Sequence, residues 1–296
     1  MGIIGVDIGG TKCAVVASAE GKIKDKISFP TEAHKGVEHT LSKIYGAIDE
    51  LLDRYFNLRQ GLAFGVSCGG PLDSKSGIIY SPPNLPGWDA VPITKLLAER
   101  YGVRAFLMND ANACALAEWH FGAAKGYQNV IFLTFGTGMG AGLILDGRLY
   151  AGTNDLAGEV GHIRLAEDGP WGYGKFGSFE GFCSGGGIAR LARQMVIRSW
   201  DEGKAVSFCH SWEDLAKLDT KRVADAAKQG DDLAKEIILT SSRYLGRGLA
   251  LLIDILNPEI IVIGSVYARC EELMRPTVIE TVRDEALSLA AARCRI

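Results

Sequence analysis

Apolar and polar positions recur along the chain with two different periods, one typical of strands and the other of helices. Residues 1–30 alternate around glycine-containing turns and predict a strand, a hairpin and a second strand. Residues 37–56 have a helical period, with an apolar face made of Leu41, Ile44, Ile48, Leu51 and Leu52. Shorter apolar runs predict strands over 62–66, 104–108, 130–135 and 259–263. Other segments predict helices over 93–101, 109–119, 188–200, 231–256 and 269–290.

The predicted elements form two mixed α/β halves that begin alike. In the second half, strand 130–135 runs into the glycine-rich residues 136–142, and residues 143–150 predict a strand, an Asp–Gly turn and a strand. The first half also begins with a strand that turns at glycines and returns. We therefore predict two lobes: residues 1–118, joined by the C-terminal helix near 284–296, and residues 119–283.

Composition narrows the class of protein. The 296 residues are 47% hydrophobic and 23% charged, as in folded soluble proteins, and no apolar run is long enough to span a membrane. Met1 leads directly into a strand without a targeting segment, so we expect a cytoplasmic protein. The seven cysteines are scattered, which favours reduced thiols. A net charge of -3 and a pI near 6.0 argue against nucleic acid as a partner and favour a small molecule.

The first turn carries candidate phosphate chemistry, in the motif Asp7-Ile8-Gly9-Gly10-Thr11-Lys12. Gly9 and Gly10 let backbone N–H groups approach anionic oxygens, while Thr11 and Lys12 add a hydroxyl and a positive charge. Asp7 can hold Mg²⁺ through water, because that ion keeps most of its water ligands. A Gly–Gly pair after a strand is often only a turn. The motif alone therefore does not establish phosphate binding, which requires a second phosphate-binding segment in the chain.

The second glycine segment supplies that site. The spacing of residues 136–142 resembles a dinucleotide-binding fingerprint, but such a motif opens a helix and here a hairpin follows. Nicotinamide binding is therefore disfavoured. A glycine hairpin that faces phosphates remains, and it mirrors the turn at Gly9-Gly10.

Candidate groups for proton transfer and hydroxyl binding follow each of these turns in the sequence. Asp110 follows a strand and opens a helix, where backbone donors and the helix dipole favour an ionised carboxylate. It is a candidate general base for a hydroxyl that attacks phosphate, although a helix cap would have the same position. Glu159 and His162 can both bond sugar hydroxyls. Asn84, in a proline-rich loop over 81–88, and Glu180 are weaker candidates by themselves.

Five ordered motifs make the chain resemble the ROK family of sugar kinases and repressors, within the actin/hexokinase-like (ribonuclease H-like) ATPases. Besides the first turn, they are Ser81-Pro82-Pro83-Asn84-Leu85-Pro86-Gly87-Trp88, Asn109-Asp110-Ala111-Asn112-Ala113, Gly136-Thr137-Gly138-Met139-Gly140 and Ala157-Gly158-Glu159-Val160-Gly161-His162. The resemblance implies a two-lobed α/β fold with a cleft between the lobes, and a homodimer. It implies Asp110 as catalytic base, and a hexose-contacting set of Asn84, Asn109, Asp110, Glu159, His162 and Glu180. ATP would contact Gly136, Thr137, Gly138 and Gly140 through its phosphates, with Gly264 and Ser265 near the adenine.

The chain departs from the family pattern at a metal site. Many members follow the Gly–His pair with a cysteine cluster that joins the histidine in binding structural zinc. Here the matching segment is Trp171-Gly172-Tyr173-Gly174-Lys175-Phe176-Gly177-Ser178, which has no cysteine. Since Trp, Tyr and Ser cannot make a zinc thiolate site, we expect no structural zinc. Trp171, Tyr173 and Phe176 are candidates to pack this loop instead.

These features predict an ATP- and Mg²⁺-dependent kinase that converts glucose to glucose 6-phosphate. Fructose, mannose, allose, N-acetylhexosamines and β-glucosides stay open as substrates, because kinases for them share much of the pattern. A sugar-responsive regulator is the alternative from another class. Such regulators carry a helical DNA-binding extension before the first phosphate turn, whereas Asp7 here ends the first strand. A catalytically dead sugar-binding protein is disfavoured because Asp7, Gly9, Gly10 and Asp110 are all present.

Overall fold

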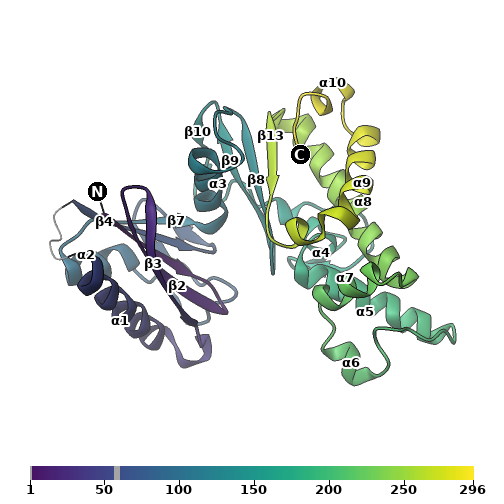
Figure 1. Ribbon diagram of the computed structural model, residues 1–296, viewed down its shortest axis with the longest axis horizontal. Coiled ribbons are helices and arrows are strands. Elements are labelled where there is room, and N and C mark those ends of the chain that lie inside the picture. Colours follow the sequence, from purple (N-terminus) through teal and green to yellow (C-terminus); the bar gives the residue numbers. More distant parts are fainter. Residues whose placement is uncertain (1, 57–60) are drawn as a thin grey trace. The chain divides into compact units, whose positions relative to one another are not determined.

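The chain folds into two units that each contain a sheet and helices (Figure 1). The structure is a computed structural model that describes residues 2–56 and 61–296. Unit 1 comprises Met1–Cys114 and Ala151–Ala157, and unit 2 comprises Ala115–Tyr150 and Gly158–Ile296. Across the described ranges, no helix combines the length and the apolar character needed to cross a membrane.

Unit 1 is built on a five-stranded sheet with the order β3-β2-β1-β4-β7. Its strands are β1 (Gly2–Ile8), β2 (Lys12–Ala19), β3 (Lys22–Pro30), β4 (Leu62–Cys68) and β7 (Ala105–Asn109). The strands β1, β2 and β3 are antiparallel neighbours, whereas β4 and β7 continue the sheet parallel to β1. A small hairpin joins β5 (Leu72–Asp73) and β6 (Ile78–Ile79).

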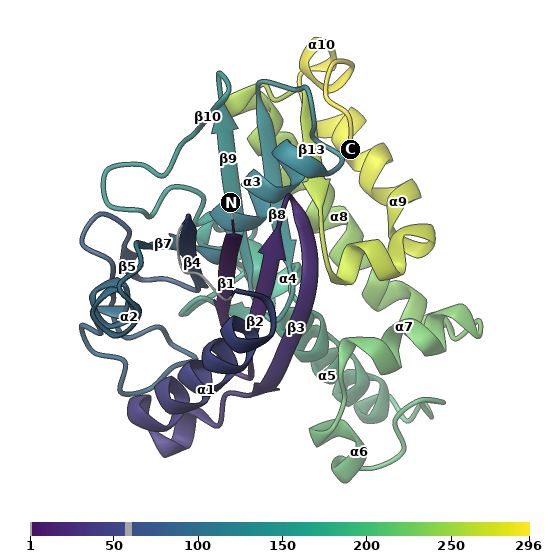
Figure 2. The ribbon, with the colours of Figure 1, turned by 60° about the vertical axis from the view of Figure 1, so that its left-hand side comes forward.

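The helix α1 (Val37–Tyr55) packs on this sheet beside β2 and β3 (Figure 2). All five apolar residues that the sequence places on one helical face are buried. Burying a Leu or Ile side chain contributes roughly 1.5–3 kcal/mol, so this face attaches the helix to the sheet. The helix α2 (Ile93–Tyr101) packs near β7, and the fully buried Trp88 anchors the proline-rich loop before it.

Unit 2 contains a four-stranded sheet with the order β10-β9-β8-β13. Its strands are β8 (Val130–Phe135), β9 (Met139–Leu145), β10 (Arg148–Leu149) and β13 (Ile260–Ile263). As in unit 1, an antiparallel meander is continued by a parallel strand, here β13 beside β8. The prediction that both halves begin with a strand, a glycine turn and a returning strand is therefore confirmed.

Helices make up most of the rest of unit 2. They are α4 (Phe179–Phe182), α5 (Gly185–Asp201), α6 (Trp212–Ala216), α7 (Thr220–Lys228), α8 (Asp232–Leu256), α9 (Val266–Glu285) and α10 (Ser288–Ala291). The long helices α8 and α9 lie side by side (Figures 1 and 2). The helix α3 (Asp110–Phe121) begins in unit 1 and continues into unit 2. Single turns of 3-10 helix occur at Ala33–Lys35 and Val160–His162.

The C-terminal residues differ from their expected assignment. The sequence suggests that residues 284–296 join the first lobe, but they group with unit 2. The reason is a short backbone pairing in which Arg295 N–H donates to Glu259 O at 2.9 Å and Ile261 N–H donates to Arg295 O at 2.8 Å. The chain end therefore extends the β13 edge of the second sheet.

Candidate functional site

The carboxylates Asp7 and Asp110 lie at one edge of the unit 1 sheet. Asp7 is the residue before the last of β1, and Asp110 follows β7 directly. Because β1, β4 and β7 are parallel, their carboxyl ends meet at the same edge, with Asp7 paired to Ser67 and Cys68 to Asn109. This shared edge brings together two charges that are far apart in sequence.

Their surroundings raise the pKa of both carboxyl groups. Although Asp7 presents surface to solvent, desolvation by the atoms around its carboxylate is the main cause of its raised pKa, followed by the negative charge of Asp110. Lys26 and a hydrogen bond from Ser67 lower the same pKa without cancelling the rise. A carboxylate whose ionisation is disfavoured by burial and by a neighbouring negative charge is a suitable place for a divalent cation.

The pKa of Asp110 differs from the expectation that its place at a helix N-terminus favours the ionised carboxylate. The backbone N–H of Ala111 donates to Asp110 Oδ1 at 2.8 Å and does lower its pKa, as a helix N-terminus should. Burial is the larger cause, however, and the net shift of the pKa is upward. The helix is also capped by Asn109, whose Oδ1 accepts from Ala111 N–H at 2.9 Å.

The first glycine turn approaches the loop that carries Asn84. Gly9 N–H donates to Lys12 O at 3.2 Å and closes the turn, while Thr31 Oγ1 donates to Gly9 O at 2.5 Å. A Cβ on Gly10 would lie 2.3 Å from Cβ of Asn84, so only glycine allows this approach. Thr11 and Lys12 are both exposed. Asn84 therefore lies directly beside the backbone of Gly10.

In unit 2, the glycine turn between β8 and β9 contacts Glu180. Glu180 Oε2 accepts from Met139 N–H at 3.1 Å, and a Cβ on Gly138 would lie 2.8 Å from the same oxygen. Burial raises the pKa of Glu180, and Met139 N–H and Arg190 oppose that rise. Gly140 N–H donates to Thr134 Oγ1 at 3.0 Å, so Gly140 serves the hairpin itself. The strand β9 already begins at Met139, which leaves a tighter turn than the sequence predicts.

Glu159 and His162 lie around the 3-10 turn Val160–His162, next to a hairpin of β11 (Trp171–Gly172) and β12 (Lys175–Phe176). Tyr173 OH donates to Glu159 Oε2, and Lys175 Nζ donates to His162 Nδ1 at 2.7 Å. A Cβ on Gly161 would meet Cβ of Glu180 at 3.2 Å. The structure thus brings Glu159, His162 and Glu180 into one neighbourhood of unit 2. Among the described residues, no group of three or more His, Cys, Asp or Glu side chains could hold a metal ion.

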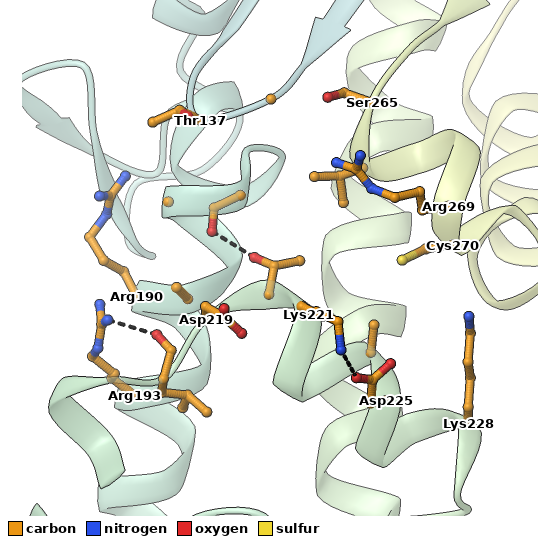
Figure 3. Close-up of a pocket in the computed structure, with 18 residues that line it drawn as sticks. Thr137, Arg190, Arg193, Asp219, Lys221, Asp225, Lys228, Ser265, Arg269 and Cys270 are labelled. Atoms are coloured by element: carbon orange, nitrogen blue, oxygen red, sulfur yellow. Dashed lines mark hydrogen bonds and ion pairs between the residues drawn. The ribbon is translucent and has the colours of Figure 1, made fainter. Parts of the chain in front are cut away.

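A cavity of about 1010 Å³ opens beside the second glycine turn (Figure 3). Of the residues predicted to contact ATP, Gly136, Thr137 and Ser265 line the cavity, while Gly138, Gly140 and Gly264 are not among the described residues that line it. Gly264 N–H instead donates to Leu133 O at 3.0 Å and continues the strand pairing. Gly185 N–H, at the start of α5, donates to Gly136 O at 2.7 Å, so the turn rests on a helix N-terminus.

Basic side chains converge on this cavity from three helices, as Figure 3 shows for Arg190 and Arg193 of α5, Lys221 and Lys228 of α7, and Arg269 of α9. Some are already engaged: Arg193 Nη2 donates to Leu218 O at 2.7 Å, and Lys221 pairs with Asp225 at 2.6 Å. Sequence reasoning missed all five cations, because no local motif links residues on three separate helices. A cavity with this volume and charge suits a nucleotide polyphosphate.

Comparison with known proteins relates the chain to one family along nearly its whole length. Residues 3–295 match the model of the ROK family. A glucokinase of Thermotoga maritima is 35% identical over 284 residues, which are 95% of this chain and 87% of that protein.

Two solved structures share this α/β architecture, which is of the actin/hexokinase-like type. The ROK hexokinase from Thermus thermophilus superimposes with a TM-score of 0.77 and 30% identity, covering 100% of this chain and 92% of that one. A ROK family glucokinase from Streptomyces griseus, solved with glucose and AMPPNP, gives a TM-score of 0.77 and 29% identity over 97% of this chain and 90% of that one.

Proposed function

The chain belongs to the ROK family, and we propose that it is an ATP-dependent kinase whose physiological reaction converts glucose to glucose 6-phosphate. The observation that carries the proposal is the Asp110 carboxylate, held beside Asn109 at the carboxyl edge of a sheet and in surroundings that raise its pKa. A raised pKa makes a carboxylate a better proton acceptor, as long as it is ionised at the working pH.

In this proposal Asp110 accepts the proton of the attacking sugar hydroxyl and orients that hydroxyl toward the phosphoryl group. The backbone N–H of Ala111 holds one carboxylate oxygen at 2.8 Å. That bond restricts rotation of the side chain, so the other oxygen is presented in a constant direction. Positioning of this kind and electrostatic stabilisation supply most of the rate enhancement in phosphoryl transfer.

Asp7 is the proposed contact to Mg²⁺, through water. Its carboxylate suits a hard cation, and a cation there would offset the repulsion between Asp7 and Asp110 that raises the pKa of Asp7. When bound, Mg²⁺ neutralises charge that develops on the phosphate oxygens. The exposed Thr11 and Lys12 offer a hydroxyl and an ammonium to the same oxygens.

ATP is the proposed occupant of the cavity in unit 2. Gly136 and Thr137 lie where α5 begins, and the positive end of that helix favours phosphate oxygens. Ser265 and Arg269 line the cavity on the α9 side, where we place the adenosine in this proposal.

Hydroxyl-binding side chains occur in both units. We assign to the hexose Asn84, Asn109 and Asp110 of unit 1, and Glu159, His162 and Glu180 of unit 2. Glucose is preferred over fructose, mannose, allose, N-acetylhexosamines and β-glucosides because the glucokinase relative is similar over almost its whole length. Family resemblance also favours a homodimer in the cytoplasm, and sedimentation equilibrium of the purified protein measures the oligomeric state.

A coupled assay of ADP release tests the proposal against that panel of sugars. We expect ADP to form only when both a sugar and Mg²⁺ are present, with the largest kcat/KM for glucose. If another sugar has a kcat/KM at least tenfold larger, the reaction class survives and the assignment of glucose is wrong. If no sugar supports ADP release, the kinase proposal is wrong.

A further inference from the structure

The short hairpin β11–β12 carries an unusual turn residue. Tyr173 and Gly174 form its two-residue loop with φ angles of 53° and 75°. Two successive positive φ angles indicate a type I′ turn, for which Asn, Asp or Gly is preferred at the first position. A bulky residue such as Tyr is rarely found in this conformation. The identity of residue 173 therefore calls for an explanation other than turn formation.

The side chains of this hairpin reach the Glu159–His162 segment. Tyr173 OH donates to Glu159 Oε2, and the Tyr173 ring meets the His162 ring edge-on with centroids 4.7 Å apart. Lys175 Nζ donates twice, to His162 Nδ1 at 2.7 Å and to the backbone O of His162 at 2.9 Å. Two proposed sugar-binding side chains are thus each held by one residue of the hairpin.

Side chains of two other residues donate hydrogen bonds to the backbone of the hairpin. Arg190 Nε donates to Trp171 O at 2.6 Å, and Ser178 Oγ donates to Gly172 O at 2.8 Å. Trp171 and Phe176 form a cross-strand aromatic pair with ring centroids 5.0 Å apart. An anchored hairpin can hold its neighbours in place, as a bound metal ion would hold a loop.

The contact from Lys175 determines which nitrogen of His162 carries the proton. A lysine ammonium has three donors and no acceptor, so Nδ1 must offer its lone pair to Lys175. A neutral imidazole that accepts at Nδ1 carries its hydrogen on Nε2. His162 then presents an N–H donor to a sugar hydroxyl, while Glu159 presents carboxylate acceptors.

Structural zinc does not fit the same place. The segment 171–178 offers no thiolate, and Lys175 already occupies Nδ1 of His162 with a positive charge that repels a metal cation. We propose that Lys175 and Tyr173 are positioning residues that replace the zinc of other ROK proteins: Lys175 fixes the Nε2–H tautomer of His162, and Tyr173 fixes the carboxylate of Glu159. The proposal rests on the kinase function for its kinetic consequences but not for the tautomer.

NMR of the ¹⁵N-histidine-labelled full chain, without sugar or ATP, tests the tautomer. The chain has five histidines, so the spectrum of a His162→Gln variant assigns the His162 signals. At a pH where imidazole is neutral, we expect the Nε2–H form in the wild type and in Lys175→Arg, which keeps a donor. Lys175→Met should give a mixture of both tautomers. An unchanged Nε2–H form in Lys175→Met would overturn the role of Lys175.

Steady-state kinetics test the consequence for the sugar. Loss of the hydrogen bond that positions the His162 ring in Lys175→Met, or the Glu159 carboxylate in Tyr173→Phe, should raise the sugar KM about tenfold. The ATP KM and kcat should stay within about twofold of the wild type, and Lys175→Arg should restore most of the loss. Lys217→Met is the matched control, because Lys217 is an exposed lysine that pairs with Glu213, four residues earlier on α6.

Besides an unchanged tautomer, three further outcomes would contradict the proposal. Equal rises in the KM of sugar and ATP, together with a lowered melting temperature, would mean that the hairpin is only structural. An unchanged sugar KM in both variants would mean that neither residue positions the sugar-binding groups. One equivalent of zinc in the purified wild-type protein would mean that the metal was not replaced. If the wild type has no kinase activity, the proposed function fails while the tautomer measurement still decides the role of Lys175.

Discussion

Gly10→Ala perturbs the close approach between the first glycine turn and the loop of Asn84. A Cβ at residue 10 would lie 2.3 Å from Cβ of Asn84 and 2.7 Å from its backbone O. Ordinary contacts begin at 3.4 Å, so the Asn84 loop must move by about 1.1 Å. A change of side-chain rotamer cannot relieve the contact, because the backbone fixes the positions of both atoms.

Displacement by about 1 Å of a group that positions a substrate can lower the rate about 100-fold. We therefore expect kcat/KM for the sugar to fall about 100-fold in Gly10→Ala. Overpacking should also lower the free energy of unfolding by about 1–3 kcal/mol. Coupled kinetics and thermal unfolding at a fixed pH measure these two effects separately.

Gly5→Ala is the matched control on the same strand, β1. Its Cβ would lie 3.9 Å from Cβ of Val16, which is an ordinary contact. We expect this variant to retain wild-type kinetics. Wild-type kcat/KM for the sugar in Gly10→Ala, with the protein folded, would refute the link between the glycine turn and sugar binding. An equal loss in both variants would refute the steric reasoning.

Further predictions concern the carboxylates and the metal. Asp110→Asn should lower kcat by about 10²–10⁴-fold yet raise the melting temperature at pH 7, because burial raises the pKa of Asp110 and its ionised form costs stability. Calorimetry should find that the difference in melting temperature between variant and wild type shrinks as the pH falls through that raised pKa. A lower melting temperature of the variant at pH 7 would contradict this reasoning. The acid limb of kcat/KM should lie above the ordinary aspartate pKa of 3.8, with activity lost as the pH falls; a limb at or below 3.8 would exclude the buried carboxylate. Gly138→Ala should displace the Glu180 carboxylate and raise the sugar KM, since its Cβ would lie 2.8 Å from Oε2; an unaltered KM would separate Glu180 from the sugar. Metal analysis of the purified protein should find no stoichiometric zinc, and a chelator should leave its melting temperature unchanged.

Periodic elements were predictable because their patterns are local. The five apolar residues of α1 fall on one face at helical spacing, and all are buried. The run of residues 130–135 was identified to the residue as β8. The helix α7 was missed because its buried face consists mainly of small alanine side chains, with Val223 as its one large apolar residue. Short segments such as β11 and β12 have too few residues to show any period.

The chemistry of the site was less predictable than the helices and strands, because it depends on burial and on contacts between separate elements. Motifs identified Asp110, but its upward pKa shift depends on burial, which sequence spacing does not report. The cations around the cavity, such as Arg190 and Arg269, come together only through the packing of separate helices. Lys175 lies in the segment 171–178, which the sequence distinguishes only by its lack of cysteine. Its hydrogen bond to His162 forms only once the hairpin is folded.

Phosphorus NMR of the purified wild-type protein incubated with Mg²⁺, ATP and glucose tests the proposed reaction most directly. We expect one equivalent of glucose 6-phosphate for each ADP formed, and formation of both products about 10²–10⁴-fold slower when Asp110→Asn replaces the wild type under the same conditions. Intact ATP in the wild-type sample, with glucose bound as measured by calorimetry, would contradict the kinase function and identify the chain as a sugar-binding protein.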